Sequence, residues 1–206
     1  MQFEYGGHAC IRLSDEKVSL IIDPFCDIGY KVNLSSADYC ICSHDHFDHN
    51  AIGEVEVKKV ICKNEYLNYP WLKVIDTYHD EDFGKKRGKN SVFVIKMGGF
   101  TICHLGDLGE PYNANLCDKL GKIDILLIPV GGKYTIDAKE SIKYAQKIAP
   151  KIIIPIHYKT TSSTVDISSK EEFISHFSNL KKSARKFEIN DLPSETTVIY
   201  IDDSEF

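Results

Sequence analysis

The chain lacks a hydrophobic leader, an apolar run of membrane length and an excess of basic residues. Its first ten residues, MQFEYGGHAC, contain no basic segment followed by an apolar stretch, and no segment approaches the roughly 18 apolar residues that span a bilayer. We therefore expect a cytoplasmic protein with no membrane partner. The net charge of −5 and the pI of about 5.9 disfavour nucleic acid as a partner, while a local basic patch for a small anionic molecule stays compatible with them.

The sequence also lacks an internal repeat, a low-complexity segment and a linker rich in proline or serine. With 206 residues, of which 43% are hydrophobic, the chain is long enough to bury one core. We expect residues 1–206 to form a single domain. The oligomeric state is left open, with a homo-oligomer among the alternatives.

The seven cysteines do not suggest a disulfide framework, because their number is odd and no leader precedes them. Several lie in apolar runs such as ADYCICS and FTICHLG, where a free thiol packs as a small hydrophobic side chain. Reduced cysteines in the core are the expectation for most of them. Cys26, beside a turn in DPFCD, fits that expectation least well.

The first half of the chain reads as short β-like runs separated by turns. The runs are 2–5, 9–13, 18–23, 38–43, 58–62, 73–78, 91–97 and 100–105. Gly98 and Gly99 separate the last two, which is a signal for a two-residue hairpin between antiparallel strands.

The second half alternates helices with buried strands. A helix is predicted over 137–150, with Asp137 as N-cap and Glu140 three residues later. A second helix is predicted over 169–180, with Phe173, Phe177 and Leu180 as its buried stripe and His176 at the surface. The runs 122–132 and 150–158 are continuously apolar, as in strands buried on both faces. A layered α/β domain is expected.

Residues 43–50, SHDHFDHN, concentrate metal-seeking side chains directly after the β-like run YCICS. They contain an H-x-H-x-D-H pattern formed by His44, His46, Asp48 and His49. Imidazole and carboxylate are preferred ligands of zinc and similar divalent ions, and four of them exceed what one tetrahedral ion with an open position needs. A surface loop rich in His and Asp is the alternative, and the position at a strand end disfavours it.

This pattern resembles the metallo-β-lactamase fold superfamily over about residues 1–160. Further ligands of that family follow in the same order in this chain: His79 in DTYHD, Asp107 in HLGDLG and His157 in IPIHY. Asp23 in LIIDP resembles an aspartate that supports the metal loop. The resemblance implies a metallo-β-lactamase-like four-layer αββα sandwich. Among its members, the small bacterial metal-dependent hydrolases related to the ascorbate-6-phosphate lactonase group look most similar.

The resemblance further implies two divalent ions, with Zn²⁺ expected before Mn²⁺, Ni²⁺ or Fe²⁺. The implied ligands are His44, His46 and His79 for the first ion, Asp48, His49 and His157 for the second, and Asp107 as a bridge. Asp48 and Asp107 would thereby be catalytic. Two such ions share a water, lower its pKa and generate hydroxide at neutral pH. Because His46 keeps the hydrolase pattern, redox chemistry is disfavoured.

Two histidines leave alternatives open. His104 lies close to Asp107 in the sequence and competes with His79 for the third position of the first ion, with His79 favoured. His104 would then orient a ligand through a hydrogen bond. His8, in GGHAC, is either a similar orienting residue or an ordinary core histidine.

A basic loop, DEDFGKKRGKN, follows His79 and carries Lys85, Lys86, Arg87 and Lys89. It is either a phosphate-binding loop, with Arg87 as the main contact, or a solvated turn. The residues expected near the mouth of the site are Lys133, Tyr134, Tyr158 and Lys159.

The function predicted from the sequence is a dinuclear metal-dependent hydrolase that uses a metal-bound hydroxide on a small, anionic ester or lactone. A phosphodiesterase or nuclease on the same fold, or a non-catalytic metal-binding protein, is the alternative.

Overall fold

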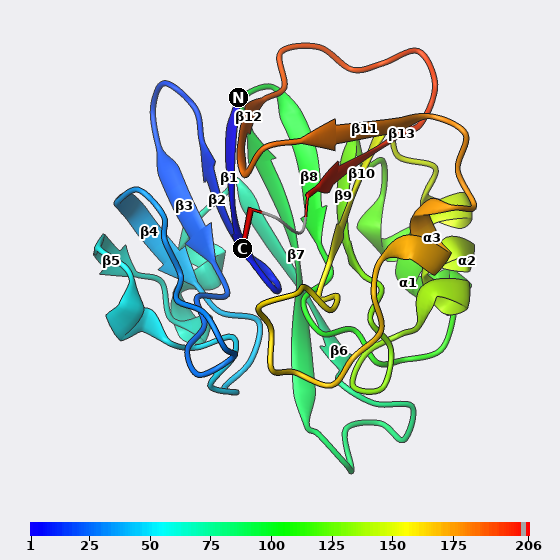
Figure 1. Ribbon diagram of the computed structural model, residues 1–206. Coiled ribbons are helices and arrows are strands. Elements are labelled where there is room, and N and C mark those ends of the chain that lie inside the picture. Colours follow the sequence, from blue (N-terminus) through cyan, green and yellow to red (C-terminus); the bar gives the residue numbers. More distant parts are fainter. Residues whose placement is uncertain (203–204) are drawn as a thin grey trace.

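The computed structural model describes residues 1–202 and 205–206 and contains two facing β-sheets (Figure 1). The first sheet has the order β12-β1-β2-β3-β4-β5. Its strands are β1 (Gln2–Gly7), β2 (Cys10–Ser14), β3 (Ser19–Ile22), β4 (Ala37–Ile41), β5 (Val57–Val60) and β12 (Lys186–Glu188). The second sheet has the order β11-β13-β10-β9-β8-β7-β6. Its strands are β6 (Leu72–Tyr78), β7 (Lys89–Met97), β8 (Phe100–His104), β9 (Ile125–Pro129), β10 (Ile152–Ile156), β11 (Leu180–Ser183) and β13 (Thr197–Ile201).

The local sequence explains most of these strands. Gly98 and Gly99 adopt φ values of 58° and 84°, a conformation that glycine reaches without steric cost, and they connect β7 to the antiparallel β8 as predicted. Strands β9 and β10 pair in parallel and are buried along their whole length. Their continuous Ile and Leu content reflects this burial on both faces.

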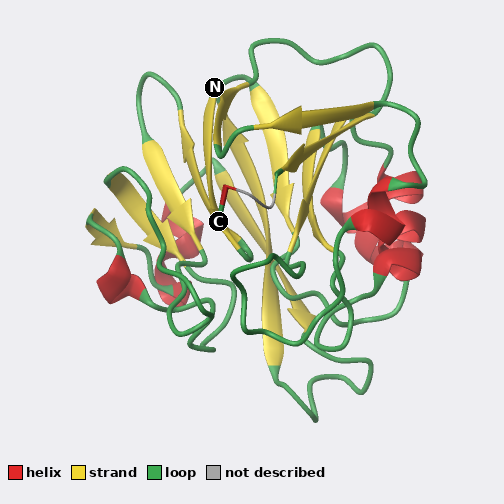
Figure 2. Cartoon of the chain, viewed as in Figure 1, coloured by secondary structure: helices red, strands yellow, loops and turns green. Residues whose placement is uncertain are grey.

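Helices cover the outer faces of both sheets (Figure 2). On the second sheet lie α1 (Ala114–Leu120), α2 (Ala138–Ile148) and α3 (Glu171–Ile174); near the first lie the 3₁₀ helices η1 (Ile52–Glu54) and η2 (Lys63–Asn68). The predicted caps are present in α2, where Asp137 accepts a hydrogen bond from the backbone N–H of Glu140. The predicted four-layer αββα arrangement is confirmed. The helical layer on the first sheet consists of the short η1 and η2. No helix in the described chain is long and apolar enough to cross a membrane.

The helix predicted over 169–180 is wrong in its extent. Only Glu171–Ile174 forms an α-helix, and Leu180 is exposed at the start of β11 instead of lying in a buried stripe. The segment leaves the helix because β11 pairs in parallel with β13 at the edge of the second sheet. Strand β13, with the β-branched sequence TVIYI, and the short β11 and β12 were not predicted; β13 had a recognisable strand signal.

Two hydrophobic clusters hold the layers together. The larger includes inward-facing residues of both sheets, such as Leu20, Ile22 and Phe93. The smaller packs Ile21 and Cys40 against Phe25, so β3 and β4 bury both faces by alternation. All seven cysteines, each in a described position, are free thiols, and four of them are buried, as expected for core residues.

The strand directions bring one set of strand ends together. Strand β1 is parallel to β3 and β4, because two antiparallel pairings separate it from β3. In the second sheet, β6, β8 and β10 are parallel to one another by the same reasoning. Their carboxyl ends lead into loops at the lower edge of the sandwich in Figure 1. The residues that follow these six strands form the candidate site.

Candidate metal centre

Seven histidine and aspartate side chains, together with His8, converge at this edge. They form three overlapping groups whose donor atoms lie within 4.8 Å of one another. The groups are His44, His46 and His79; His8, Asp48, His49 and His157; and His44, His49 and Asp107. The sequence separates these residues by up to 149 positions, and the parallel strand ends bring them together.

Asp107 lies between the other groups. Its Oδ2 is 3.2 Å from His79 Nε2 and 3.2 Å from His157 Nε2, and its Oδ1 is 3.1 Å from His49 Nε2. Burial alone would raise the pKa of Asp107, but the nearby His157 and His49 hold it well below its usual value. Burial opposes protonation of His49, yet Asp107 and Asp23 raise the pKa of that imidazole above its usual value.

Asp23 holds residues 43–50, which contain the H-x-H-x-D-H pattern, through hydrogen bonds to Ser43 and His49. Its Oδ1 accepts a hydrogen bond from Ser43 N (2.6 Å), and its Oδ2 accepts from Ser43 Oγ (2.7 Å) and His49 Nδ1 (3.0 Å). Because Ser43 Oγ donates to Asp23, it accepts from His44 Nδ1 at 2.9 Å. In its neutral form, each of the two imidazoles therefore carries its proton on Nδ1 and directs the Nε2 lone pair into the site. Sequence reasoning placed Asp23 here but overlooked Ser43.

Asn90 and Gly106 position Asp107. Asn90 donates to Leu105 O and Thr77 Oγ1, both at 2.9 Å, and its Oδ1 accepts from Asp107 N at 3.0 Å. Gly106 has φ 56°, and a Cβ there would lie 2.5 Å from Asn90 Oδ1. A glycine is therefore required. The contact between Asn90 and Asp107 was not predicted from the sequence, in which Asn90 directly follows the basic loop and is a candidate only for holding that loop.

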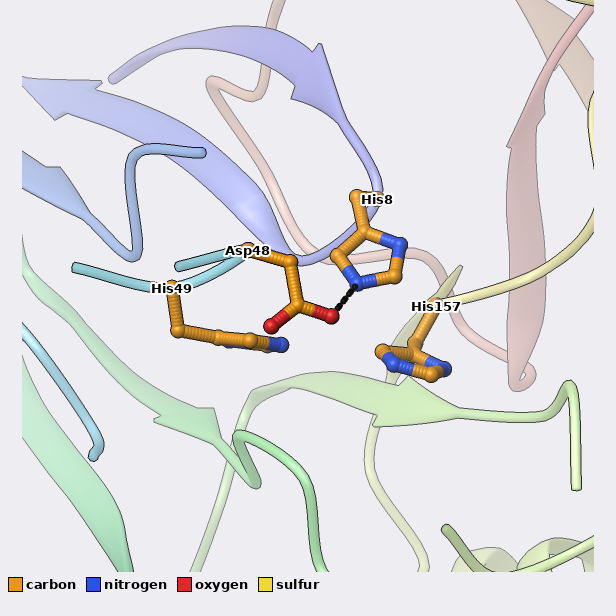
Figure 3. A group of neighbouring side chains, drawn as sticks. All are labelled: His8, Asp48, His49 and His157. Atoms are coloured by element: carbon orange, nitrogen blue, oxygen red, sulfur yellow. Dashed lines mark hydrogen bonds and ion pairs between the residues drawn. The ribbon is translucent and has the colours of Figure 1, made fainter. Parts of the chain in front are cut away.

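His8 lies in the second group, beside the end of β1. Its Nε2 is 3.3 Å from Asp48 Oδ2, and its ring centroid is 4.1 Å from that of His157 (Figure 3). Burial and the neighbouring His157 lower its pKa to about 4. His8, Asp23 and His157 all adopt left-handed backbone angles, with φ between 50° and 54°. Such strain in non-glycine residues concentrates at functional sites.

His104 lies behind the site and uses both ring nitrogens on the backbone. Nε2 contacts Ala9 O at 2.8 Å, and Nδ1 accepts from Gly106 N at 3.0 Å. No lone pair remains for an ion. Instead, His104 connects the loop that carries His8 to the turn that carries Asp107.

The donor set fits divalent ions. Within the described residues, His79 Nδ1 and His157 Nδ1 are buried without a hydrogen-bond partner, and His49 Nε2 and Asp107 Oδ1 lie 3.1 Å apart without hydrogen-bond geometry. Burying such atoms unpaired is unfavourable. Burial also lowers the pKa of His44 to about 3, so this imidazole is neutral and able to ligate at neutral pH.

A cleft of about 550 Å³ opens beside these residues. Its lining includes His46, Asp48, His79 and Asp107 of the cluster together with Arg87 and Tyr134. Asp27, Thr164, Val165, Asp166 and the exposed ring of Phe47 complete its wall. The cleft therefore combines the metal-seeking side chains with one cation, two further carboxylates and some apolar surface.

Three of the four residues expected near the mouth are otherwise engaged. Lys133 forms an ion pair with Asp166. Tyr158 is 2% exposed and packs in the core, with its ring stacked near Tyr5. Lys159 Nζ donates to Ser163 O and Val165 O at 2.6 and 2.8 Å. Neither Tyr158 nor Lys159 lines the cleft.

The facing sheets and the cluster at their edge define a class of protein. The sequence profile described as "Beta-lactamase superfamily domain" matches residues 2–157, and the chain belongs to this family. The resemblance drawn from the H-x-H-x-D-H loop is thereby confirmed.

Individual proteins similar to this chain have narrower descriptions than the family profile. A "UPF0173 metal-dependent hydrolase" of Methanospirillum hungatei is 31% identical over 186 residues, covering 78% of this chain and 84% of the relative. A protein of the same name from Carboxydothermus hydrogenoformans is 28% identical over 193 residues, covering 78% and 85%. The crystal structure of a candidate Zn-dependent hydrolase of the metallo-β-lactamase superfamily from Thermotoga maritima superimposes with a TM-score of 0.78, at 31% identity over 97% of both chains.

Proposed function

We propose that the protein is a dinuclear metal-dependent hydrolase that acts on a small, anionic ester or lactone. Membership of the family and relatives named metal-dependent hydrolases support the hydrolase class. The observation that carries the dinuclear site is the position of Asp107, whose carboxylate lies within 3.2 Å of histidines from two separate donor groups. A single ion would leave one of these groups without a role.

In this proposal His44, His46 and His79 would hold one ion, Asp48, His49 and His157 would hold the other, and Asp107 would contact both. Two divalent ions held in this way would acidify a bound water and polarise the scissile bond. The residues of the chain do the rest. Asp23 and Ser43 fix the tautomers of His44 and His49, and His8 orients the Asp48 carboxylate.

The position and the charge of Arg87 support the proposal that the substrate is anionic. Its Cζ lies 4.1 Å from the centroid of the Tyr134 ring, and both side chains line the cleft. Lys85 pairs with Asp82 and Lys86 with Glu81. Within the described residues Arg87 has no carboxylate partner, so its charge is available to a ligand. A planar guanidinium binds carboxylate or phosphate through two hydrogen bonds.

Metal stoichiometry tests the proposal. Protein dialysed mildly after loading should retain about two ions per chain by elemental analysis, because two three-residue groups share one bridging carboxylate. His157→Ala should lose about one of the two. His176→Ala is the matched control, since His176 is exposed and lies outside the cluster, and its imidazole contacts Gln146 and Phe177. One ion or fewer in fully active parent protein contradicts the dinuclear site.

The same metal-quantified protein is then assayed on lactones, carboxylic esters, thioesters and phosphodiesters. Hydrolysis of lactones or esters is the expected result. Activity confined to phosphodiesters assigns the site to that alternative instead. The closer likeness to the ascorbate-6-phosphate lactonase group stays a prediction, and zinc as the physiological ion is likewise part of the proposal.

A further inference from the structure

The loop between β6 and β7, residues 79–88, extends beyond the edge of the sandwich (Figure 1). Its sequence, HDEDFGKKRG, is polar and charged, and a loop of this composition is usually solvated and variable. In this protein the loop has an internal framework. Gly88 N donates to Gly84 O at 2.9 Å, His79 N donates to Gly88 O at 3.1 Å, and the ring of Phe83 packs edge-on against Tyr78.

One buried carboxylate organises this framework. Asp80 is 4% exposed. Its Oδ1 accepts hydrogen bonds from Asp82 N and Gly84 N at 2.8 and 3.0 Å. Its Oδ2 accepts from Lys86 N and Arg87 N at 3.1 and 2.8 Å. Hydrogen bonds to an ionised carboxylate are stronger than those between neutral groups, so four of them fix the backbone on both sides of the loop tip.

The last of these bonds determines where Arg87 lies. Because the Arg87 amide is held by Asp80, its side chain starts from a fixed point and its guanidinium rests on the Tyr134 ring. Asp80 and Arg87 both border a hollow of about 240 Å³ next to His79. Arg87 also lines the main cleft and a second cavity of about 560 Å³ beside His44 and His46. It therefore stands at the junction of the hollows around the metal-seeking cluster.

We propose that Asp80 is a positioning residue: it holds residues 80–87 in one conformation and so presents Arg87 at the cleft as a preorganised site for a carboxylate or phosphate group of the substrate. The inference rests on the proposed function for its substrate, while the ordering of the loop stands apart from it. A guanidinium ordered before binding loses less conformational entropy when the anion arrives. Asp80 then contributes to substrate selectivity without touching the substrate.

The test compares Asp80→Ala with Asp82→Ala. Both remove one negative charge from the same loop, but only Asp80 binds the Arg87 amide, whereas the Asp82 carboxylate bonds to Lys85 Nζ. Asp80→Asn keeps one acceptor oxygen and serves if the alanine variant folds poorly. The probes are mono-4-nitrophenyl glutarate and 4-nitrophenyl pentanoate, which share a leaving group and differ in a terminal carboxylate.

In metal-loaded Asp80→Ala, KM for the glutarate ester should rise about tenfold with kcat nearly unchanged, because a remote anionic group is bound similarly in the ground and transition states. KM for the pentanoate ester should change less than about twofold by the same reasoning. Hydrogen–deuterium exchange at the Gly84, Lys86 and Arg87 amides should accelerate. Asp82→Ala should match the parent in all three measurements.

Three results overturn the inference. The first is unchanged amide exchange in Asp80→Ala, and the second is an equal change in KM for the two esters. The third is loss of metal in Asp80→Ala but not in Asp82→Ala, which would mean that Asp80 acts by holding the neighbouring His79 in place. If the parent hydrolyses neither these esters nor any lactone, the proposed function fails on its own. Calorimetric titration with glutarate, which needs no turnover, then decides the inference. Weaker binding by Asp80→Ala than by Asp82→Ala supports it, and equal binding overturns it.

Discussion

Replacing Asp23 by asparagine tests the support beneath the metal loop. The substitution preserves the size of a fully buried side chain but exchanges one acceptor oxygen for an NH₂ group. Asp23 now accepts three hydrogen bonds, from Ser43 N, Ser43 Oγ and His49 Nδ1. Asparagine can accept from Ser43 N while its NH₂ group faces His49. Two donors then oppose each other, unless His49 moves its proton to Nε2.

The magnitude follows from these bonds. Losing one hydrogen bond to a buried carboxylate costs about 1.5–3 kcal/mol of unfolding free energy. His49 Nε2 lies 3.1 Å from Asp107 Oδ1. A proton moved to this nitrogen would occupy the lone pair that the proposed metal ion needs. Loss of an orienting partner of this kind weakens metal binding about 10–100-fold, equivalent to about 1.4–2.8 kcal/mol. Both effects are large enough to measure separately.

The assay pairs urea unfolding of the metal-free protein with competition against a chromogenic chelator. Asp38→Asn is the matched control. Asp38 also accepts from a serine N–H and from the same serine's hydroxyl, Ser19 at 2.8 Å in each case, and from Lys58 Nζ at 2.7 Å. It lies in β4, outside the cluster. Asp38→Asn should lose stability and keep metal affinity. If Asp23→Asn also keeps the parent's metal affinity, the tautomer argument is refuted.

Three further predictions concern individual histidines and Arg87. His79→Ala should lose metal and activity together. His104→Ala, whose ring nitrogens both bond to the backbone, should keep most of its metal by elemental analysis and lose a smaller part of the rate. The opposite ranking of the two variants would exchange the roles of the two histidines. Arg87→Ala should raise KM selectively for an ester that carries a phosphate, with metal content unchanged; an equal change on the phosphate-free partner would reject anion recognition. Because burial depresses the pKa of His8 from 6.5 to about 4, its stabilising contribution is present above pH 6.5 and is lost as pH falls toward 4. Urea unfolding of the metal-free protein should therefore show a loss of stability over this window, of about 3 kcal/mol from His8 alone. His8→Gln should show a shallower dependence on pH, and an equal dependence in the variant and the parent would contradict the reasoning.

The local sequence was sufficient for those parts of the protein that depend on neighbours in the chain. The H-x-H-x-D-H loop is visible because His44, His46, Asp48 and His49 are adjacent in sequence. The hairpin at Gly98 and the cap of α2 at Asp137 are visible because turn and cap chemistry acts over two to four residues. Family resemblance added the order of the distant ligands, and with it the sandwich fold.

Tertiary structure decided everything that depends on which strand ends meet. The His44–Ser43–Asp23 connection joins two strand ends, and Asn90 reaches Asp107 from a neighbouring strand. Tyr158 follows His157 directly, yet its side chain is buried in the core. Hydrophobic periodicity identifies a strand without identifying its partner, since pairing across a sheet is set by contacts between residues far apart in the chain. For the same reason the sequence identified most of the donors, while only the packing of the two sheets placed the Asp107 carboxylate among them.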